Sequence, residues 1–195
     1  DLHPRVRRQR QMCIRDSTYF ATLPGMKDRT VMCNSLSKTY SITGWRLGYV
    51  CAPAYVMDRV RKVHDFLTVG AAAPLQEAVI AGLELPDSYY QGVRDLFTHR
   101  KNIFCKGLDE IGLKYYEPQG TYFVMVDIGE FGYESDYDFC IDLARDVKVG
   151  AVPGSSFFKE PVNNYIRLHF AKSDETLHEA LNNLSKIREI IKIKK

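Results

Sequence analysis

The densest group of side chains that could do chemistry lies in one short segment. It contains Ser35-x-Ser37-Lys38, and Arg46 follows eight residues after the lysine. Hydroxyl groups and a guanidinium suit a phosphate dianion, because a guanidinium can bind two phosphate oxygens at once. A lysine amine can condense with a carbonyl group to form a Schiff base. The segment therefore predicts a site for a cofactor that carries one aldehyde and one phosphate, as pyridoxal 5'-phosphate (PLP) does.

The same segment, SLSKTYSITGWRLGYV, resembles the lysine segment of class I/II aminotransferases of the fold-type I group. The resemblance implies that Lys38 forms the Schiff base with PLP and later moves protons on the α-carbon of the substrate. It also implies that Arg46 and Ser35 hold the cofactor phosphate, with Ser37 as a further candidate.

Two distant segments extend the resemblance. PGSSF (153–157) is followed by NYIRLHFA (164–171), in which Arg167 fills the position of the family arginine that grips the substrate α-carboxylate. PQGTYF (118–123) resembles the glycine-containing turn of the family's small domain. Since these motifs follow one another in the family's order, the resemblance covers the chain from Val31 to its last helix.

The first seventeen residues, DLHPRVRRQRQMCIRDS, differ in character from the remainder. They hold five arginines against two aspartates, while the other residues balance 22 basic against 22 acidic side chains. RRQRQMCIRDS resembles the translation of a sequencing-library adapter, so residues 1–17 are interpreted as a non-native leader. The balanced remainder gives no reason to expect nucleic-acid binding.

Hydrophobic periodicity and turn residues predict the secondary structure. The expected elements are strands over 31–37 and 45–50, helices over 54–67, 75–84 and 87–111, a hairpin over 113–128, a helix over 135–147, a strand with a loop over 147–157, a strand over 164–171 and one final helix over 173–191. The expected fold class is α/β. Residues 18–85 would form the C-terminal part of a PLP-binding large domain, and residues 86–195 a small α+β C-terminal domain.

The function that the resemblance implies is transfer of an amino group between an amino acid and a 2-oxo acid. The family places an asparagine, an aspartate on the pyridine nitrogen and a tyrosine upstream of the lysine, and this chain lacks that motif. We therefore expect a truncated and inactive piece of an active cytoplasmic enzyme that forms a homodimer. No stretch of eighteen apolar residues predicts a membrane span.

Two alternative functions stay open at the level of sequence. One is a carbon–sulfur lyase or synthase of the same fold, and the other is the effector-binding domain of an aminotransferase-like transcription regulator. Ser35-x-x-Lys38 also fits the S-x-x-K motif of penicillin-binding enzymes, but the S-D-N and K-T-G partners of that motif are missing. The histidines and cysteines show no metal-ligand spacing.

Overall fold

The computed structural model describes residues 20–191, and the chain divides into two compact units. The first unit ends at Val93 and the second begins at Arg94, so the division falls inside one long helix. The expected domains, residues 18–85 and 86–195, stay a prediction, and the expected leader, residues 1–17, lies outside the described residues. Within the described residues, no helix is both long and apolar enough to cross a bilayer.

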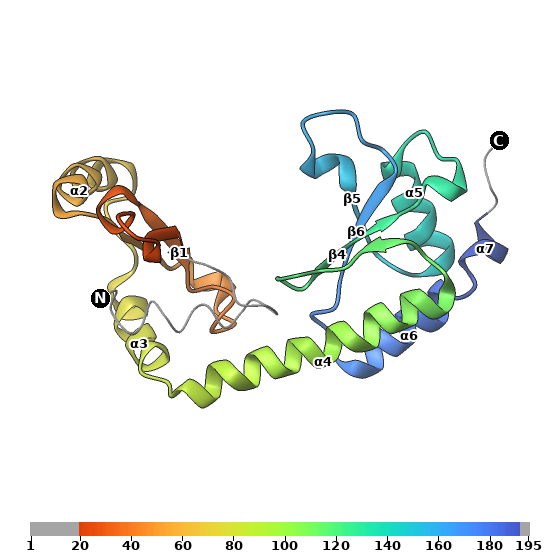
Figure 1. Ribbon diagram of the computed structural model, residues 1–195, viewed down its shortest axis with the longest axis horizontal. Helices are drawn as coiled ribbons and strands as arrows, with labels where there is room; N and C mark the ends of the chain where they lie inside the picture. Colours follow the sequence, from red (N-terminus) through yellow and green to blue (C-terminus); the bar gives the residue numbers. More distant parts are fainter. Residues whose placement is uncertain (1–19, 192–195) are drawn as a thin grey trace. The chain divides into compact units, whose positions relative to one another are not determined.

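The first unit contains an antiparallel two-stranded hairpin followed by helices (Figure 1). Its elements are short 3-10 helices at Phe20–Thr22 and Lys27–Arg29, β1 (Met32–Ser35), a 3-10 helix at Thr43–Trp45, β2 (Gly48–Cys51), α2 (Ala54–Thr68), α3 (Ala73–Leu83) and the start of α4 (Asp87–Ile111). The strand that the sequence predicts from Trp45 begins only at Gly48. The reason is local, because Trp45 closes the 3-10 helix and Arg46 has a left-handed backbone with φ of 56°.

Helix α2 shows how local signals can define an element without packing. It begins directly after Pro53, whose fixed φ and missing N–H suit a helix start. None of its residues is buried, and Phe66 is 92% exposed. The helix that the sequence predicts is therefore present, although within the described residues its apolar side chains are exposed or only partly buried.

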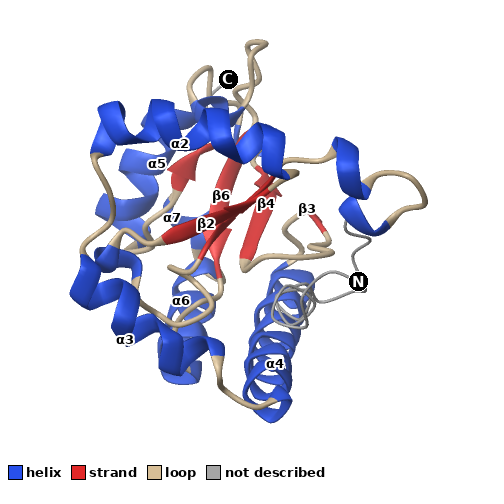
Figure 2. Cartoon of the chain, turned by 90° about the vertical axis from the view of Figure 1, so that its left-hand side faces the viewer, coloured by secondary structure: helices blue, strands red, loops and turns tan. Residues whose placement is uncertain are grey.

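The second unit is built on a four-stranded antiparallel sheet in the order β3-β4-β6-β5. Its elements are the remainder of α4, β3 (Tyr115–Tyr116), β4 (Phe123–Asp127), a 3-10 helix at Gly129–Phe131, α5 (Asp136–Asp142), a π-helical turn at Leu143–Val147, β5 (Val152–Pro153), a 3-10 helix at Gly154–Phe157, β6 (Tyr165–His169), α6 (Asp174–Leu184) and α7 (Ile187–Ile190). Figure 2 distinguishes these helices from the strands.

Alternation along β4 and β6 gives the sheet two different faces, because successive side chains of a strand point in opposite directions. Val124, Val126, Ile166 and Leu168 are buried in the core. Figure 1 shows α4 and α6 running side by side along the sheet, and their most buried side chains are Phe104, Leu108, Leu177 and Leu184. The opposite alternation places Arg167 and His169 on the other face.

The final helix expected over 173–191 is wrong in one respect. Ser173 caps the start of α6 by accepting a hydrogen bond from the Thr176 N–H, as its position suggests. The helix then stops at Leu184, and α7 starts after Lys186. The break allows Arg188 of α7 to donate to the carbonyl oxygens of Ile111 and Gly112, at 2.6 and 2.9 Å. This tertiary contact satisfies carbonyls at the end of α4, and periodicity within 173–191 contains no signal for it.

Candidate active site

The loop between β1 and β2 brings four of the five predicted site residues together. Ser35 ends β1 and pairs with Gly48 of β2, and the Leu36 N–H donates to the Leu47 carbonyl oxygen at 3.1 Å. Ser35 and Arg46 therefore lie at the two ends of a closed loop that carries Lys38. The side chains of Ser35, Lys38 and Arg46 are exposed.

Apolar packing fixes this loop within the first unit. Leu36 and Leu47 are 4% and 5% exposed, and they form a core cluster with Val79 of α3. The cluster also contains these partly buried residues: Tyr40, Ile42, Trp45, Tyr49, Leu75 and Leu83. Because residues on both sides of Lys38 take part, the lysine projects from an anchored backbone.

Three tyrosines add polar contacts to the same anchor. The Tyr40 and Tyr90 hydroxyls lie 2.8 Å apart, and the Tyr89 hydroxyl donates to the Thr39 carbonyl oxygen at 2.8 Å. Burial, together with the Tyr90 hydrogen bond, raises the pKa of Tyr40 well above its ordinary value. The carbonyl group of the residue next to Lys38 is therefore tied to the first turn of α4.

Arg46 is held in place by its own loop. Its Nη1 donates to the Thr43 carbonyl oxygen at 2.9 Å, and its left-handed backbone costs about 1–2 kcal/mol for a residue with a Cβ. Backbone strain of this kind is concentrated at functional sites.

The two serines of the motif differ in their surroundings. The Ser35 hydroxyl accepts from the Ser37 N–H at 3.2 Å and stays exposed. The Ser37 side chain is buried, and the backbone carbonyl oxygen of Ser37 accepts a hydrogen bond from the Ile42 N–H at 3.0 Å. Ser35 can thus present a hydroxyl to a ligand, whereas Ser37 mainly shapes the turn.

The donor set of this loop fits a phosphorylated aldehyde. Lys38 and Arg46 supply two positive charges, Ser35 supplies a hydroxyl, and the segment from Val31 to Cys51 contains no acidic residue. A phosphate dianion would find hydrogen-bond donors and uncompensated positive charge there.

Gly48 has a steric role beside this site. A Cβ on Gly48 would lie 2.6 Å from the backbone oxygen of Asn34, which is too close for any side chain. The two strands can approach in this way only with glycine at position 48.

Arg167 lies in the second unit, in the middle of β6. Its strand neighbours are Met125 on one side and Val152 on the other. The guanidinium carbon lies 4.0 Å from the centroid of the Phe123 ring and 3.9 Å from that of the Phe157 ring. The guanidinium of Arg167 therefore contacts two aromatic rings.

The segment that carries Phe157 is anchored by a buried carboxylate. Asp136 is 2% exposed, and it accepts from the Ser155 N–H at 2.7 Å and from the Ser155 hydroxyl at 2.9 Å. At the start of the same segment, a Cβ on Gly154 would lie 2.5 Å from the Tyr165 backbone oxygen. The 3-10 helix Gly154–Phe157 is thus fixed against both α5 and β6.

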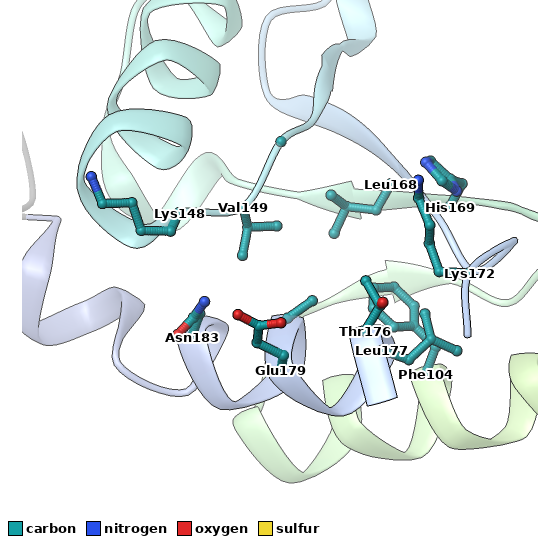
Figure 3. Close-up of a pocket in the computed structure, with 12 residues that line it drawn as sticks. Phe104, Lys148, Val149, Leu168, His169, Lys172, Thr176, Leu177, Glu179 and Asn183 are labelled. Atoms are coloured by element: carbon teal, nitrogen blue, oxygen red, sulfur yellow. The ribbon is translucent and has the colours of Figure 1, made fainter. Parts of the chain in front are cut away.

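The second unit also contains a cavity of about 220 Å³ beside α6 (Figure 3). Buried Phe104, Leu168 and Leu177 form its apolar lining, and Lys172 and Glu179 are among its polar residues. His169 is part of it, and burial together with the charges of Lys172 and Arg167 lowers the pKa of this histidine. None of the five predicted site residues lines the cavity.

The sequence motifs did not reveal the residues that support Arg167. Phe123 and Phe157 stand inside the quoted motifs, yet nothing in their spacing indicates that both rings reach one guanidinium. Asp136 follows the helix cap Ser135 and looks like an ordinary acidic residue of a first turn. Its partner Ser155 is nineteen residues away, so only the tertiary structure shows the contact.

A mixed α/β chain with a lysine-bearing loop and a strand arginine has the features of the enzyme class that the sequence resembles. Residues 10–184 match the family model "Aminotransferase class I and II", and the chain belongs to this family. The resemblance seen in the sequence and the expected fold class are both confirmed.

Relatives and solved structures agree with this assignment. The probable N-succinyldiaminopimelate aminotransferase DapC of Mycobacterium tuberculosis is 33% identical over 179 residues, which cover 87% of this chain and 45% of that protein. The methionine aminotransferase of Escherichia coli K12 is 34% identical over 165 residues, 84% of this chain and 43% of that protein.

Among solved structures, YbdL of Escherichia coli, described as having a methionine aminotransferase function, matches with a TM-score of 0.84 and 32% identity. The match covers 91% of this chain and 47% of that one. An aromatic aminotransferase of Pyrococcus horikoshii OT3 matches with a TM-score of 0.81 and 28% identity, over 92% of this chain and 49% of that one. This chain therefore spans about half the length of the relatives it matches.

Proposed function

We propose that this chain contributes Lys38, the phosphate-binding loop and Arg167 to a PLP-dependent aminotransferase that acts on an amino acid and a 2-oxo acid. The observation that carries the proposal is the closed loop in which Ser35, Lys38 and Arg46 share one anchored turn without an acidic neighbour. Membership of the aminotransferase family supports it.

Each residue of the loop has a proposed task. PLP, when bound, supplies an electron sink that makes the α-proton of an amino acid removable. Lys38 would hold the cofactor aldehyde covalently, while Arg46 and Ser35 would hold its phosphate. Ser37 supports the turn through its backbone, since its side chain is buried.

The proton transfer is assigned to the lysine amine. With PLP and substrate bound, the Lys38 amine would take the α-proton as a general base and return it as a general acid. The hydrogen bonds of Tyr89 to the Thr39 carbonyl oxygen and of Tyr90 to the Tyr40 hydroxyl limit how far the lysine backbone can move. Arg167 binds the substrate carboxylate through its planar N–H donors.

Activity is proposed for a full-length protein that carries this chain. Because these 195 residues correspond to about half of a relative, we expect that they bind PLP weakly and do not turn over substrate alone. The homodimer and the cytoplasmic location that the resemblance implies belong to the same proposal.

Reductive labelling tests the cofactor site. The chain is incubated with PLP, reduced with borohydride, digested and mapped by mass spectrometry. We expect labelling at Lys38 to saturate, and Arg46→Gln to raise the PLP concentration needed by about tenfold, since one charge-assisted hydrogen bond is lost. Arg59→Gln, an exposed arginine on α2, is the matched control and should have no effect.

Three results would contradict the proposal. Labelling spread over surface lysines such as Lys27, with none at Lys38, would reject the lysine assignment. Equal responses of the Arg46 and Arg59 variants would reject the phosphate site. In a full-length protein, release of the amino group as ammonia together with pyruvate, without its transfer to a 2-oxo acid acceptor, would indicate a lyase.

A further inference from the structure

The guanidinium of Arg167 is held by two aromatic rings that come from different elements. Phe123 is the first residue of β4, and Phe157 is the last residue of the 3-10 helix Gly154–Phe157. The rings lie 4.0 and 3.9 Å from the guanidinium carbon, which is the distance of a cation–π contact. We call this arrangement of Phe123, Arg167 and Phe157 the aromatic clamp.

From this geometry we propose that Phe123 and Phe157 are positioning residues for substrate binding, and that the clamp fixes the guanidinium plane so that only its in-plane N–H groups face an acceptor. The proposal rests on the proposed function, in which Arg167 binds the substrate carboxylate. Burial of apolar side chains alone would not require these two rings to lie against a guanidinium.

The clamp can immobilise the arginine side chain before the ligand binds without occupying its N–H donors. A free arginine side chain loses rotamer entropy when it is immobilised, and this loss weakens binding if it occurs only when the ligand arrives. A neighbouring carboxylate could immobilise the side chain, but it would also occupy the donors and neutralise the charge. Among residues 20–191, Arg167 forms no ion pair, and its strand neighbours Met125 and Val152 are apolar.

Aromatic rings avoid this conflict because they attract the cation through the ring quadrupole without carrying a charge. Each ring also lies 3.9–4.0 Å from the guanidinium carbon, so the part of the group that a ring covers is shielded from water. What stays available is the edge of the group, whose fork of N–H donors matches the two oxygens of a carboxylate. The clamp therefore keeps the full positive charge and aims it in one plane.

The two rings differ in how well they suit an experiment. Phe123 belongs to the central strand β4, so its replacement would also disturb the sheet. Phe157 is 47% exposed, which makes a change there tolerable for folding. Its neighbour Phe158 is 45% exposed and lies against Tyr165 with ring centroids 6.3 Å apart, which makes it a matched control.

A first experiment measures how strongly the clamp protects the Arg167 Nε–H proton from exchange with water, using the whole chain. The ¹⁵N–¹H signal of Arg167 Nε is assigned by its loss in Arg167→Gln, and its exchange with water is measured. We expect Phe157→Leu to speed that exchange about tenfold, Phe158→Leu to leave it unchanged and Phe157→Tyr to restore it, because a tyrosine ring has the same face. Equal exchange rates in the Phe157→Leu and Phe158→Leu variants would overturn the clamp.

A second experiment separates the clamp from the proposed function. Pyruvate is titrated as the simplest 2-oxo acid, and its Kd is read from the same spectra. Loss of one cation–π contact of about 1 kcal/mol corresponds to a Kd about fivefold higher in Phe157→Leu. In a full-length protein, the same change should raise KM for the amino donor with kcat within about twofold, since the interaction exists before the reaction begins.

The outcomes distinguish the two ideas. If Arg167→Gln abolishes pyruvate binding and Phe157→Leu does not change it, the clamp is refuted while the substrate arginine stands. If Arg167→Gln itself leaves pyruvate binding unchanged, the proposed carboxylate site is wrong, whatever the exchange rates show.

Discussion

Replacing Asp136 should loosen the segment that carries Phe157. The carboxylate accepts two hydrogen bonds from Ser155, at 2.7 and 2.9 Å, and it is 2% exposed. Hydrogen bonds to a charged group contribute about 1.5–3 kcal/mol each, and Ser155 is partly exposed, so water can replace some of the loss. We expect Asp136→Ala to lower the free energy of unfolding of the second unit by about 3 kcal/mol.

Urea denaturation followed by far-UV circular dichroism measures this loss. With a slope of about 2 kcal/mol per molar, the midpoint should fall by about 1.5 M. The exchange of the Ser155 amide proton should become faster at the same time. Asp138→Ala is the matched control, because Asp138 lies in the same first turn of α5 but is exposed and its side chain makes no contact with Ser155.

The control decides between a specific anchor and a general effect of helix-end charge. Both aspartates lie near the positive end of the helix dipole, which contributes about 0.5 kcal/mol to each. If the two alanine variants have the same midpoint, or if the Ser155 amide exchanges at its native rate in Asp136→Ala, the anchoring role assigned to Asp136 is wrong.

Three further predictions concern packing, ionisation and capping. Gly107→Ala should lower stability by about 1–3 kcal/mol, because the new Cβ would lie 2.4 Å from a methyl carbon of Leu181 on α6. Gly92, also in α4, has no atom within 4 Å of where a Cβ would lie. Gly92→Ala should therefore raise the free energy of unfolding by about 0.5–1 kcal/mol in the same urea assay. The raised pKa of Tyr40 favours its neutral form in the folded state, so the stability it contributes is intact below pH 10.0, the ordinary tyrosine pKa, and is lost as the pH rises above it. Fluorescence of the single tryptophan during urea unfolding should report this loss, and Tyr40→Phe should reduce its pH dependence. Ser173→Ala should cost about 1 kcal/mol by removing the cap of α6, whereas Ser173→Asn should retain most of the native midpoint.

Several elements of the fold could be predicted from local signals alone. Pro53 and Pro74 stand at the starts of α2 and α3, and Gly112 follows α4 with a φ of 75°, a backbone that glycine adopts without strain. Each of these signals acts within a few residues. The alternation of apolar and polar residues predicts β4 and β6 in the same way, because every second side chain of a strand points to the buried face of the sheet.

Features that depend on distant partners could not be predicted in this way. The final helix breaks at Lys186, and α7 then places Arg188 at the end of α4. β2 starts late because Arg46 takes a left-handed backbone that a sequence pattern does not require of an arginine. The break in the final helix depends on a contact between distant parts of the chain, whereas the late start of β2 follows from the local backbone of Arg46.

The candidate site shows the same difference between local motifs and distant contacts. Family resemblance pointed to Lys38, Arg46 and Arg167 as candidate site residues, since their motifs are short and continuous. What holds them was not visible, because Tyr40 and Tyr90 are fifty residues apart in the sequence. A motif thus names the groups that touch a ligand, whereas the groups that orient them are distributed over the fold.

Gly48 and Gly154 have a consequence for how variants of this chain will be interpreted. At each position a Cβ would lie 2.5–2.6 Å from a backbone oxygen of a neighbouring strand, and backbone cannot step aside as a side chain can. A saturation-mutagenesis library selected only for folding should therefore reject every substitution at both positions. Since each glycine lies beside a loop with proposed ligand-binding or positioning residues, a screen for activity alone would score them as active-site residues. Selecting the same library once for folding and once for cofactor binding would separate steric intolerance from chemical need, position by position.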